Sequence, residues 1–348
     1  MKVAPLYHAL AAESWCAPGI VHTGQHYDAN MSEAFFRELR LPEPAHTLEI
    51  GSGTHAEQTG RTMIAYEGVC HRDRPDAIVV VGDVNATAAC AMVGAKLWIP
   101  VVHLEAGLRS RDRRMPEEIN RLVTDALADL LWTPSPDADA NLLAEGVPAD
   151  KIECIGNIMI DSFEMLRAKI AAAGTRERLA PGSAPFAVVT LHRPSNVDAR
   201  DKLAELVQAL VQVSRELTVV FAVHPRTRKR LEEFGLLSTI TGAPAMRVTE
   251  PLSYIEFMNL VSHCAIAITD SGGVQEETTY LGVPCATLRD NTERPITLTQ
   301  GTNRLLKPHQ LVAAAREVLA GKWPRGTRPA LWDGHAAQRA ARSLQARL

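Results

Sequence analysis

The chain has 348 residues, of which 22% are charged, and its formal net charge is -3. That length allows two domains with cores of their own, and the near balance of charge argues against a dedicated nucleic-acid-binding protein. No run reaches the ~20 apolar residues of a membrane span, and Pro5, His8 and Glu13 interrupt the apolar core that a signal peptide would need.

Short apolar runs rich in β-branched residues alternate with amphipathic segments along the chain. Runs that are apolar on both faces are typical of parallel strands covered by helices, and repeated strand–helix units favour parallel sheets. The predicted strands are Ala77–Val81, Val101–Leu104, Lys151–Ile155, Phe186–Thr190, Thr218–Ala222 and Ala265–Thr269, and the clearest helices are Ala86–Leu97, Glu118–Leu130 and Lys202–Leu217.

This pattern predicts an α/β protein with two Rossmann-like domains. We place them at residues 1–170 and 183–330, because the Gly-, Pro- and Ala-containing stretch 171–185 is the best linker candidate. Residues 331–348 are expected to form a C-terminal helix that packs back on the N-terminal domain.

A glycine-rich segment follows the first strand-like run, which begins at His46. The sequence Gly51-Ser-Gly-Thr-His-Ala56 fits the G-x-G-x-x-A pattern of dinucleotide-binding and methyltransferase loops. A dinucleotide site needs an acidic residue about 20 positions later, at the end of the next strand. Glu67 lies in a helical stretch and Asp83 comes too late, so the sequence predicts a loop that lines an interdomain cleft.

Carboxylates follow two of the predicted strands. Asp83 and Glu105 each come just after a strand end, and the carboxyl ends of parallel strands form the edge of a sheet where ligands bind. An acid beside a buried strand costs free energy unless something binds it. Glu117 and Glu118 open a helix, where they could act only as charges suited to the positive helix end, with Arg121 as a surface partner of Glu117.

Two histidines follow strands in the second half. His192 and Arg193 come after the strand at 186–190, and His224 comes after the strand at 218–222. A lone histidine is usually a structural residue, but a position at a strand end beside an arginine favours a place in the cleft. We therefore predict that all three residues line the substrate site.

A strand that breaks into a glycine turn and then a helix resembles a phosphate cradle. After the strand at 265–269 the chain reads Asp270-Ser271-Gly272-Gly273, and Glu277 follows one helical turn later. Glycines let backbone N–H groups approach an anion, and the helix start adds about half a positive charge. An ordinary turn is the alternative, but the next strand also ends in a charged loop that contains Arg294.

The ordered stretch from Asp270 to Asn303 closely resembles the non-hydrolysing UDP-N-acetylglucosamine (UDP-GlcNAc) 2-epimerases, whose fold is that of the GT-B glycosyltransferases. The resemblance extends over nearly the whole chain and implies two domains whose parallel sheets face a cleft. It implies interconversion of UDP-GlcNAc and UDP-N-acetylmannosamine (UDP-ManNAc) at C2, through elimination and re-addition of UDP. Alternatives are a hydrolysing relative that releases N-acetylmannosamine and UDP, an enzyme for a modified sugar such as a diacetamido uronate, and a UDP-sugar-binding protein with weakened turnover.

The resemblance also implies roles for individual residues. The catalytic positions are Asp83, Glu105, Glu117 and His192. The substrate-binding positions are Lys2, Phe257 near the uracil, Ser271, Gly272 and Gly273 at the diphosphate, Glu277 at the ribose, and Arg294, to which we add Arg193 and His224 from their places at strand ends.

Two segments depart from the family pattern. Residues 1–10 resemble the family's first helix, so we expect the first strand of the N-terminal domain and its loop arginine to be absent. Either the start codon has been assigned too late, or the chain has weakened activity. Gln25 and Asp28 lie in, and Met31 just after, a segment that resembles the family's Gln-His loop, where some bacterial members bind a second, activating UDP-GlcNAc. Asp28 and Ser195 replace a glutamine and a glutamate of that site, which argues against activation.

The remaining expectations concern partners and location. The six cysteines form no C-x-x-C pair and fall mostly in apolar runs, which predicts reduced thiols in a cytoplasmic protein without disulfides or zinc. We expect a UDP-sugar as substrate, no metal, no cofactor, no nucleic acid and no membrane as partner, and a homodimer, as relatives usually are.

Overall fold

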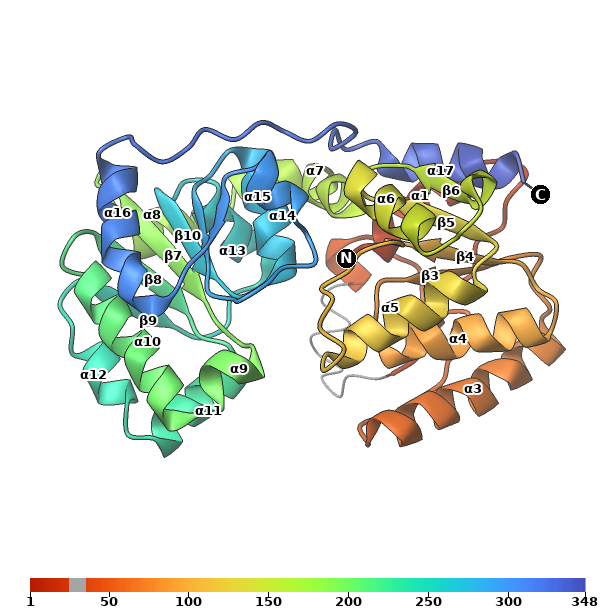
Figure 1. Cartoon of the computed structure of the whole chain (residues 1–348), viewed down its shortest axis with the longest axis horizontal. Coiled ribbons are helices and arrows are strands. Elements are labelled where there is room, and N and C mark those ends of the chain that lie inside the picture. Colours follow the sequence, from red (N-terminus) through yellow and green to blue (C-terminus); the bar gives the residue numbers. More distant parts are fainter. Residues whose placement is uncertain (25–35, 348) are drawn as a thin grey trace. The chain divides into compact units, whose positions relative to one another are not determined.

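The computed structural model describes residues 1–24 and 36–347 (Figure 1). The chain forms two compact units, the first from Met1–Met165 with Ala330–Leu348 and the second from Leu166–Pro329. The boundary falls inside helix α7 (Ile158–Ala171). The segment predicted as a linker contains helix α8 (Thr175–Leu179), which packs against α13 (Tyr254–Val261) within the second unit.

The first unit contains a parallel four-stranded sheet of order β3-β4-β5-β6. A separate parallel pair, β1 with β2, is formed by two-residue strands. The strands are β1 (Val21–His22), β2 (His46–Thr47), β3 (Ile78–Val81), β4 (Val101–Leu104), β5 (Leu130–Thr133) and β6 (Ile152–Cys154). The helices are α1 (Val3–Ala11), α3 (His55–Arg72), α4 (Asn85–Lys96), α5 (Pro116–Leu127), α6 (Pro136–Ala144) and α17 (Ala336–Gln345).

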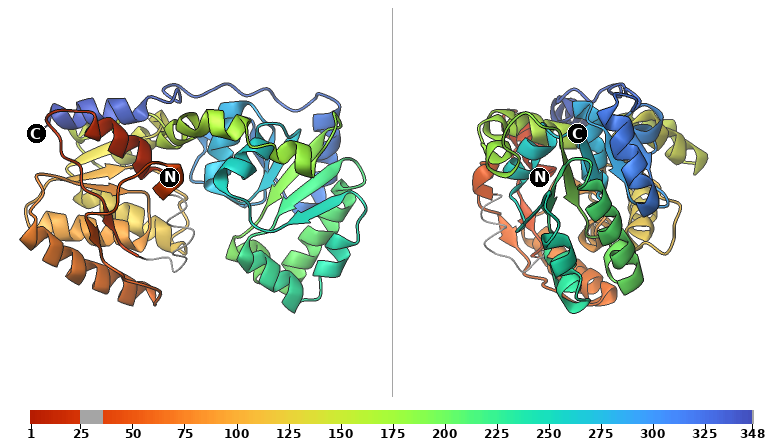
Figure 2. Two further views of the ribbon diagram at one scale, coloured as in Figure 1. Left: turned by 180° about the vertical axis from the view of Figure 1, so that it is seen from behind. Right: turned by 90° about the vertical axis from the view of Figure 1, so that its left-hand side faces the viewer.

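Helices cover both faces of this sheet. Val102 and Leu104 of β4 pack with residues of α1 and α17, whereas Val101 packs with residues of α3, α4 and α6. Successive strand residues point to opposite faces, so a strand buried on both sides is mainly apolar, and His103 is the polar exception in β4. The C-terminal helix α17 lies against α1 in the same unit (Figure 1 and Figure 2).

The second unit contains a parallel six-stranded sheet of order β12-β11-β10-β7-β8-β9. From β7 the chain moves outward through β8 to β9, returns to β10 on the other side of β7, and continues to β12. The strands are β7 (Phe186–Thr190), β8 (Thr218–Ala222), β9 (Met246–Thr249), β10 (Ile266–Thr269), β11 (Cys285–Thr287) and β12 (Asn303–Leu305). The helices include α9 (Pro194–Val197), α10 (Arg200–Val213), α11 (Pro225–Glu233), α12 (Leu237–Thr241), α14 (Gly272–Leu281), α15 (Ile296–Thr299) and α16 (Leu311–Leu319).

The parallel sheets of both units confirm the predicted α/β class, and the differences lie at short elements. The helix predicted up to Leu130 ends at Leu127, because Leu130 begins β5. The predicted strand from His46 pairs only over two residues, since Glu49 and Gly51 adopt positive φ angles of 51° and 68°. None of the helices in residues 1–24 and 36–347 combines the length and apolar character needed to cross a membrane.

Candidate active site

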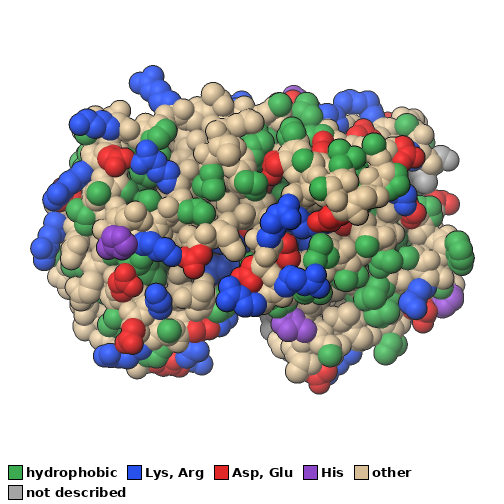
Figure 3. Space-filling view, viewed as in Figure 1, with side chains coloured by type: hydrophobic (Ala, Val, Ile, Leu, Met, Phe, Trp, Pro, Cys, Tyr) green, Lys and Arg blue, Asp and Glu red, His purple; other side chains and the backbone are tan. Residues whose placement is uncertain are grey.

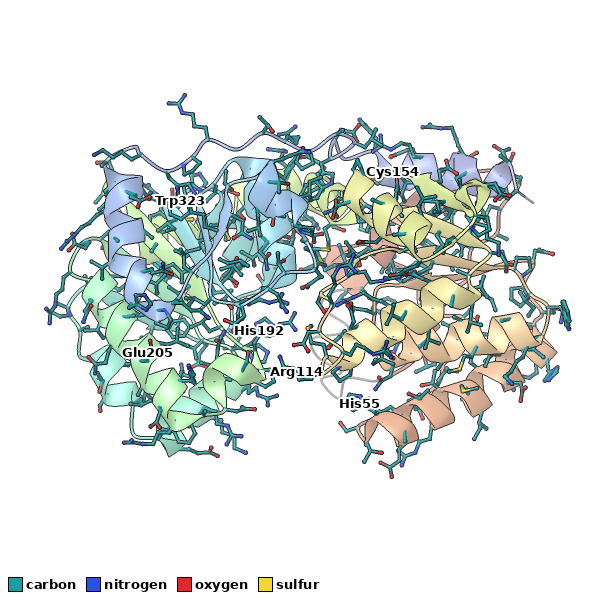
Figure 4. All side chains as sticks on the ribbon, viewed as in Figure 1. His55, Arg114, Cys154, His192, Glu205 and Trp323 are labelled. Atoms are coloured by element: carbon teal, nitrogen blue, oxygen red, sulfur yellow. The ribbon has the colours of Figure 1, made fainter. Side chains whose placement is uncertain are left out.

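The second unit has a topological switch point between β7 and β10. These strands are neighbours, yet the chain leaves β7 toward β8 and leaves β10 toward β11. Loops that follow two such strands diverge and open a crevice at the carboxyl edge of the sheet, where ligands bind in open α/β folds. His192 follows β7 (Figure 4) and Asp270 follows β10, so both lie at this edge according to the ends of their strands.

Asp270 ties the two loops together. Its fully buried carboxylate accepts hydrogen bonds from the backbone N–H groups of His192 and Arg193, at 3.1 and 3.0 Å, and from the side-chain amide of Asn196 at 3.0 Å. Burial raises the pKa of Asp270, but its hydrogen bonds and the charge of His192 lower that pKa below its ordinary value. The carboxylate is therefore a fixed negative charge at the switch point.

The same carboxylate orients the imidazole of His192. The distance from His192 Nδ1 to Asp270 Oδ1 is 3.0 Å, so Nδ1 carries a proton, and Nε2 has no partner among the described residues. The ring of His224 lies 5.5 Å from that of His192, between centroids. Burial and the neighbouring His192 lower the pKa of His224, whose Nδ1 accepts the N–H of Arg226. The pair therefore combines an oriented histidine with a neutral one.

Helix α14 begins beside these loops and leaves its first N–H groups uncapped. Ser271 is the N-cap residue but makes no side-chain capping hydrogen bond, so the donors of the first turn are available to an anion. Gly272 is needed here, because a Cβ atom would lie 2.6 Å from Arg294 Nη1 and 2.9 Å from Glu293 Oε1. The helix start is thus in direct contact with a buried arginine.

An arginine cluster adjoins this helix start. Arg294 contacts Glu276 and Glu293 at 2.7 and 2.6 Å, and Glu293 also contacts Arg289 at 2.7 Å and Arg193 at 3.9 Å. Burial opposes the ionisation of Glu293, but Arg294 and Arg289 keep its pKa well below the usual range. Three guanidinium groups therefore face two carboxylates.

Part of this cluster's hydrogen-bonding capacity is unused. Arg193 Nε and Arg289 Nη1 are buried without a hydrogen-bond partner in the described part of the chain. Buried donors are nearly always paired in native structures. A net positive cluster with spare donors, beside an uncapped helix start, is suited to bind a phosphate group.

Glu277 lies one turn into α14 and is bound by a tyrosine of α13. Tyr254 Oη donates a hydrogen bond to Glu277 Oε1 at 2.7 Å. Burial raises the pKa of Glu277 to about 8, and the neighbouring Glu276 acts in the same direction. Phe257 is half-buried three residues after Tyr254, on the same face of α13. Tyr254 was not identified from the sequence, because its partner is set by helix packing.

In the first unit, Asp83 and Glu105 follow the adjacent strands β3 and β4. The N–H of Gly82 donates to the carbonyl of Leu104 at 3.0 Å, which continues the β3–β4 pairing to the two carboxylates. Glu105 has a positive φ of 74°, and its N–H donates to the carbonyl of Trp132 at 3.1 Å. A non-glycine residue in this conformation is strained, and such residues cluster at functional sites.

Glu105 is also buried with one oxygen in use. Oε2 forms an ion pair with Lys2, whereas Oε1 is buried without a hydrogen-bond partner in residues 1–24 and 36–347. A buried, unsatisfied carboxylate oxygen is costly unless a ligand binds it. The structure thus brings Lys2, Gly82 and Glu105 together at the carboxyl edge of the sheet.

The inward face of α5 is charged rather than apolar. Arg121 is only 2% exposed and contacts Asp83 at 3.0 Å, and it also pairs with Glu118. Glu118 accepts the N–H groups of Ser110 and Arg111 at 2.9 and 2.8 Å and so holds the preceding loop. The alternative in which Arg121 is a surface partner of Glu117 is therefore wrong. Glu117 is half-exposed without a partner among the described residues.

The structure gives the glycine-rich loop a helix-capping role. Thr54 caps α3 in a reciprocal capping box with Glu57, which uses the N–H groups that a nucleotide phosphate would need. Asn85 of α4 contacts His55 and Gln58 of α3 at 3.1 and 2.9 Å, which joins the two helices. Gln25, Asp28 and Met31, which lie in or just after the segment that resembles the Gln-His loop, are outside the described residues.

Most of the charged groups that form the ion pairs described above are buried rather than on the surface. On the face shown in Figure 3, acidic and basic side chains are interspersed over both units. Within residues 1–24 and 36–347, no group of three or more histidine, cysteine, aspartate or glutamate side chains is arranged to hold a metal ion. Each unit instead places ionised groups and spare hydrogen-bonding atoms at the carboxyl edge of its sheet.

Comparisons with known proteins show the family to which the chain is similar. Residues 8–345 match the family model described as UDP-N-acetylglucosamine 2-epimerase. The chain is 41% identical to the UDP-N-acetylglucosamine 2-epimerase of Methanocaldococcus jannaschii, over 99% of this chain and 95% of that protein. It is 39% identical to the UDP-2,3-diacetamido-2,3-dideoxy-D-glucuronate 2-epimerase of Pseudomonas aeruginosa, over 92% of this chain and 86% of that protein.

A solved structure of the M. jannaschii enzyme, in complex with UDP-GlcNAc and UDP, superposes with a TM-score of 0.90 and covers 99% of this chain and 96% of that one at 41% identity. The family model and the relatives span nearly all of the chain, and identities of this size over such lengths show common descent. The chain therefore belongs to the UDP-N-acetylglucosamine 2-epimerase family.

Proposed function

We propose that this chain interconverts UDP-GlcNAc and UDP-ManNAc by inversion at C2 without net hydrolysis. The observation that carries the proposal is the pairing of an oriented acid–base group, His192 on Asp270, with the arginine cluster beside the start of α14. Proton transfer and departure of an anionic leaving group need these two kinds of group. The M. jannaschii relative bears the name of this activity.

The chemistry at C2 explains why an acid–base group and an anion-binding group are both needed. The C2 proton has no adjacent carbonyl and is hardly acidic, so it leaves together with the C1 diphosphate. A base takes the C2 proton as the C1–O bond to UDP breaks, which gives a 2-acetamidoglucal. An oxygen of UDP then bonds to C1 again while a proton is delivered to the opposite face of C2. No redox cofactor is required by this route.

The second unit would hold the leaving group. The N–H groups at the start of α14, around Ser271, Gly272 and Gly273, and the guanidinium groups of Arg193 and Arg294 suit the diphosphate. They stabilise the charge that develops on UDP as the C1–O bond breaks. Glu277 would accept hydrogen bonds from the ribose, and Phe257 would contact the uracil.

The side chains at the strand ends would transfer the protons. Inversion needs groups that act on opposite faces of the sugar ring. His192, whose Nδ1 is held by Asp270, would act through Nε2. In the first unit, Glu105 has an unsatisfied oxygen and Glu117 has no partner among the described residues, so both can act as base or acid. Asp83 would complete the set, with Lys2 as a substrate contact.

A time course in heavy water tests the proposal. Proton NMR of UDP-GlcNAc with the protein should show deuterium entering C2 and UDP-ManNAc accumulating to equilibrium, without free N-acetylmannosamine. Release of N-acetylmannosamine with UDP would instead identify a hydrolysing enzyme. Binding of UDP without any label at C2 would identify a UDP-sugar-binding protein and refute the proposed reaction.

A UDP-linked diacetamido uronate is a second candidate substrate, because the P. aeruginosa relative is 39% identical and is named for this sugar. The same experiment should therefore include the UDP-diacetamido glucuronate. A higher kcat/KM for this sugar than for UDP-GlcNAc would change the substrate assignment and leave the C2 chemistry intact.

A further inference from the structure

A fully buried histidine of the first unit lies between two hydrogen-bond acceptors. His103 belongs to β4, two residues before Glu105, and has no exposed surface. Its Nδ1 lies 2.5 Å from Asp125 Oδ1 of α5, and its Nε2 lies 2.8 Å from the backbone carbonyl of Gly82, which follows β3. The ring therefore bridges the end of one strand and a helix.

These two contacts decide the number of protons on the ring. A backbone carbonyl can only accept, so Nε2 must carry a proton, and the carboxylate of Asp125 requires a proton on Nδ1 as well. A neutral imidazole has a single N–H and would place a lone pair against one acceptor. Rotation of the ring by 180° would put carbon atoms against both acceptors and lose both hydrogen bonds.

Asp125 is held in its ionised form by other donors. Asp125 Oδ2 accepts the N–H of Gly107 at 3.1 Å and contacts Arg109 Nη1 at 2.7 Å. A backbone N–H and a guanidinium can only donate, and the adjacent positive charge of Arg109 favours the ionised carboxylate. Asp125 therefore acts as the acceptor toward His103.

The surrounding charges balance a positive histidine. Arg109 also contacts Glu145, at the end of α6, at 2.8 and 2.6 Å. The titratable groups linked to His103 by these contacts are Asp125 from α5, Arg109 from the loop after β4, and Glu145 beyond Arg109, whereas the Lys2–Glu105 pair lies on the far side of Gly82 beside Asp83. With His103 protonated, two positive charges face two negative ones, which is the condition under which buried charges are tolerated.

We propose that His103 is a buried imidazolium that positions the Gly82–Asp83 turn beside Glu105. Its bond to the Gly82 carbonyl fixes the peptide that carries Asp83, and β4 carries Glu105 two residues away. Asp125 also holds Gly107, on the other side of Glu105, so one charged pair restrains both strand ends. Because His103 is fully buried, it acts through the two carboxylates rather than by contact with substrate.

Nuclear magnetic resonance tests the charge state without reference to activity. In protein carrying 15N-labelled histidine rings at neutral pH, His103 should show two protonated ring nitrogens, assigned by the signals lost in His103→Asn. In Asp125→Asn one of these nitrogens should lose its proton. An unprotonated ring nitrogen of His103 in the wild-type protein would overturn the proposal.

The positioning role rests on the proposed function and is tested by kinetics. An asparagine amide at position 103 cannot donate to acceptors on opposite sides, so His103→Asn should lower kcat by about 100-fold through displaced carboxylates, with little change in KM. UDP affinity should stay at the wild-type value, which also reports that the second unit is folded. His71→Asn, an exposed histidine of α3, is the matched control and should keep wild-type kcat.

The outcomes separate the two proposals. A folded His103→Asn protein with wild-type kcat would refute positioning, as would equal losses from His103→Asn and His71→Asn. If the wild-type protein binds UDP but never labels C2, the proposed reaction fails, while the ring nitrogens still decide whether His103 is an imidazolium.

Discussion

A single methyl group at Gly272 should weaken UDP binding. In Gly272→Ala the new Cβ atom would lie 2.6 Å from Arg294 Nη1, and ordinary contacts begin at 3.4 Å, so the guanidinium must retreat by 3.4 minus 2.6, or 0.8 Å. It cannot swing freely, because Glu276 and Glu293 hold it at 2.7 and 2.6 Å. The guanidinium would therefore move out of the position from which we propose that it contacts a phosphate.

The loss of UDP affinity follows from the hydrogen bond between Arg294 and the phosphate that the substitution would remove. A hydrogen bond to a charged group contributes about 1.5–3 kcal/mol, so calorimetry should show UDP binding about 10- to 100-fold weaker. Overpacking adds about 1–3 kcal/mol of destabilisation, which denaturant unfolding measures separately.

Gly60→Ala is the matched control, because a Cβ atom at Gly60 in α3 would meet nothing within 4 Å. It should leave UDP affinity unchanged and add up to about 1 kcal/mol of helix stability. Wild-type UDP affinity in a folded Gly272→Ala protein would refute the assignment of Arg294 to the phosphate.

Three further substitutions test the other contacts. Asp270→Asn should slow C2 labelling about 100-fold or more, because it removes the charge that orients His192, and unchanged labelling would contradict the assignment. Arg121→Ala should cost about 3–5 kcal/mol by leaving two carboxylates unpaired, whereas the exposed Arg61→Ala should change unfolding free energy by less than about 1 kcal/mol. Burial raises the pKa of Glu277 from its ordinary 4.5 to about 8, so the folded state retains a proton that the unfolded chain releases, and stability falls as pH rises through that window. Glu277→Gln should flatten this pH dependence of Tm, and equal slopes would contradict the reasoning.

Residues at strand ends could be predicted from the sequence because their position depends on local pattern alone. A short apolar run of β-branched residues identifies a buried strand, and the next polar residue must lie at the sheet edge. This reasoning placed Asp83, Glu105 and His192 at carboxyl edges, where the structure has them. It could not indicate that Asp270 holds His192, because that contact depends on β10 lying beside β7 rather than beside β9.

The charged face of α5 shows why amphipathic reasoning fails at a functional site. Glu118, Arg121 and Asp125 recur at the spacing of a single helix face, and that spacing was visible in the sequence. The usual rule assigns charged residues to solvent, yet all three are buried because each contacts the turn or loop at a strand end. A face with alternating charges at helical spacing, next to strand-end acids, is the signal that could have identified them.

Both units contain the same arrangement of an aspartate and a histidine, but the two histidines differ in their roles. In each, a buried aspartate accepts at least one backbone N–H at a strand end and holds Nδ1 of a histidine, as Asp270 does for His192 and Asp125 for His103. The difference lies in the other ring nitrogen. The Gly82 carbonyl binds Nε2 of His103, which leaves that ring no atom for chemistry and makes it a positioning group. Nε2 of His192 has no partner among the described residues, so the same arrangement there leaves a ring nitrogen available for the proton transfer that we propose.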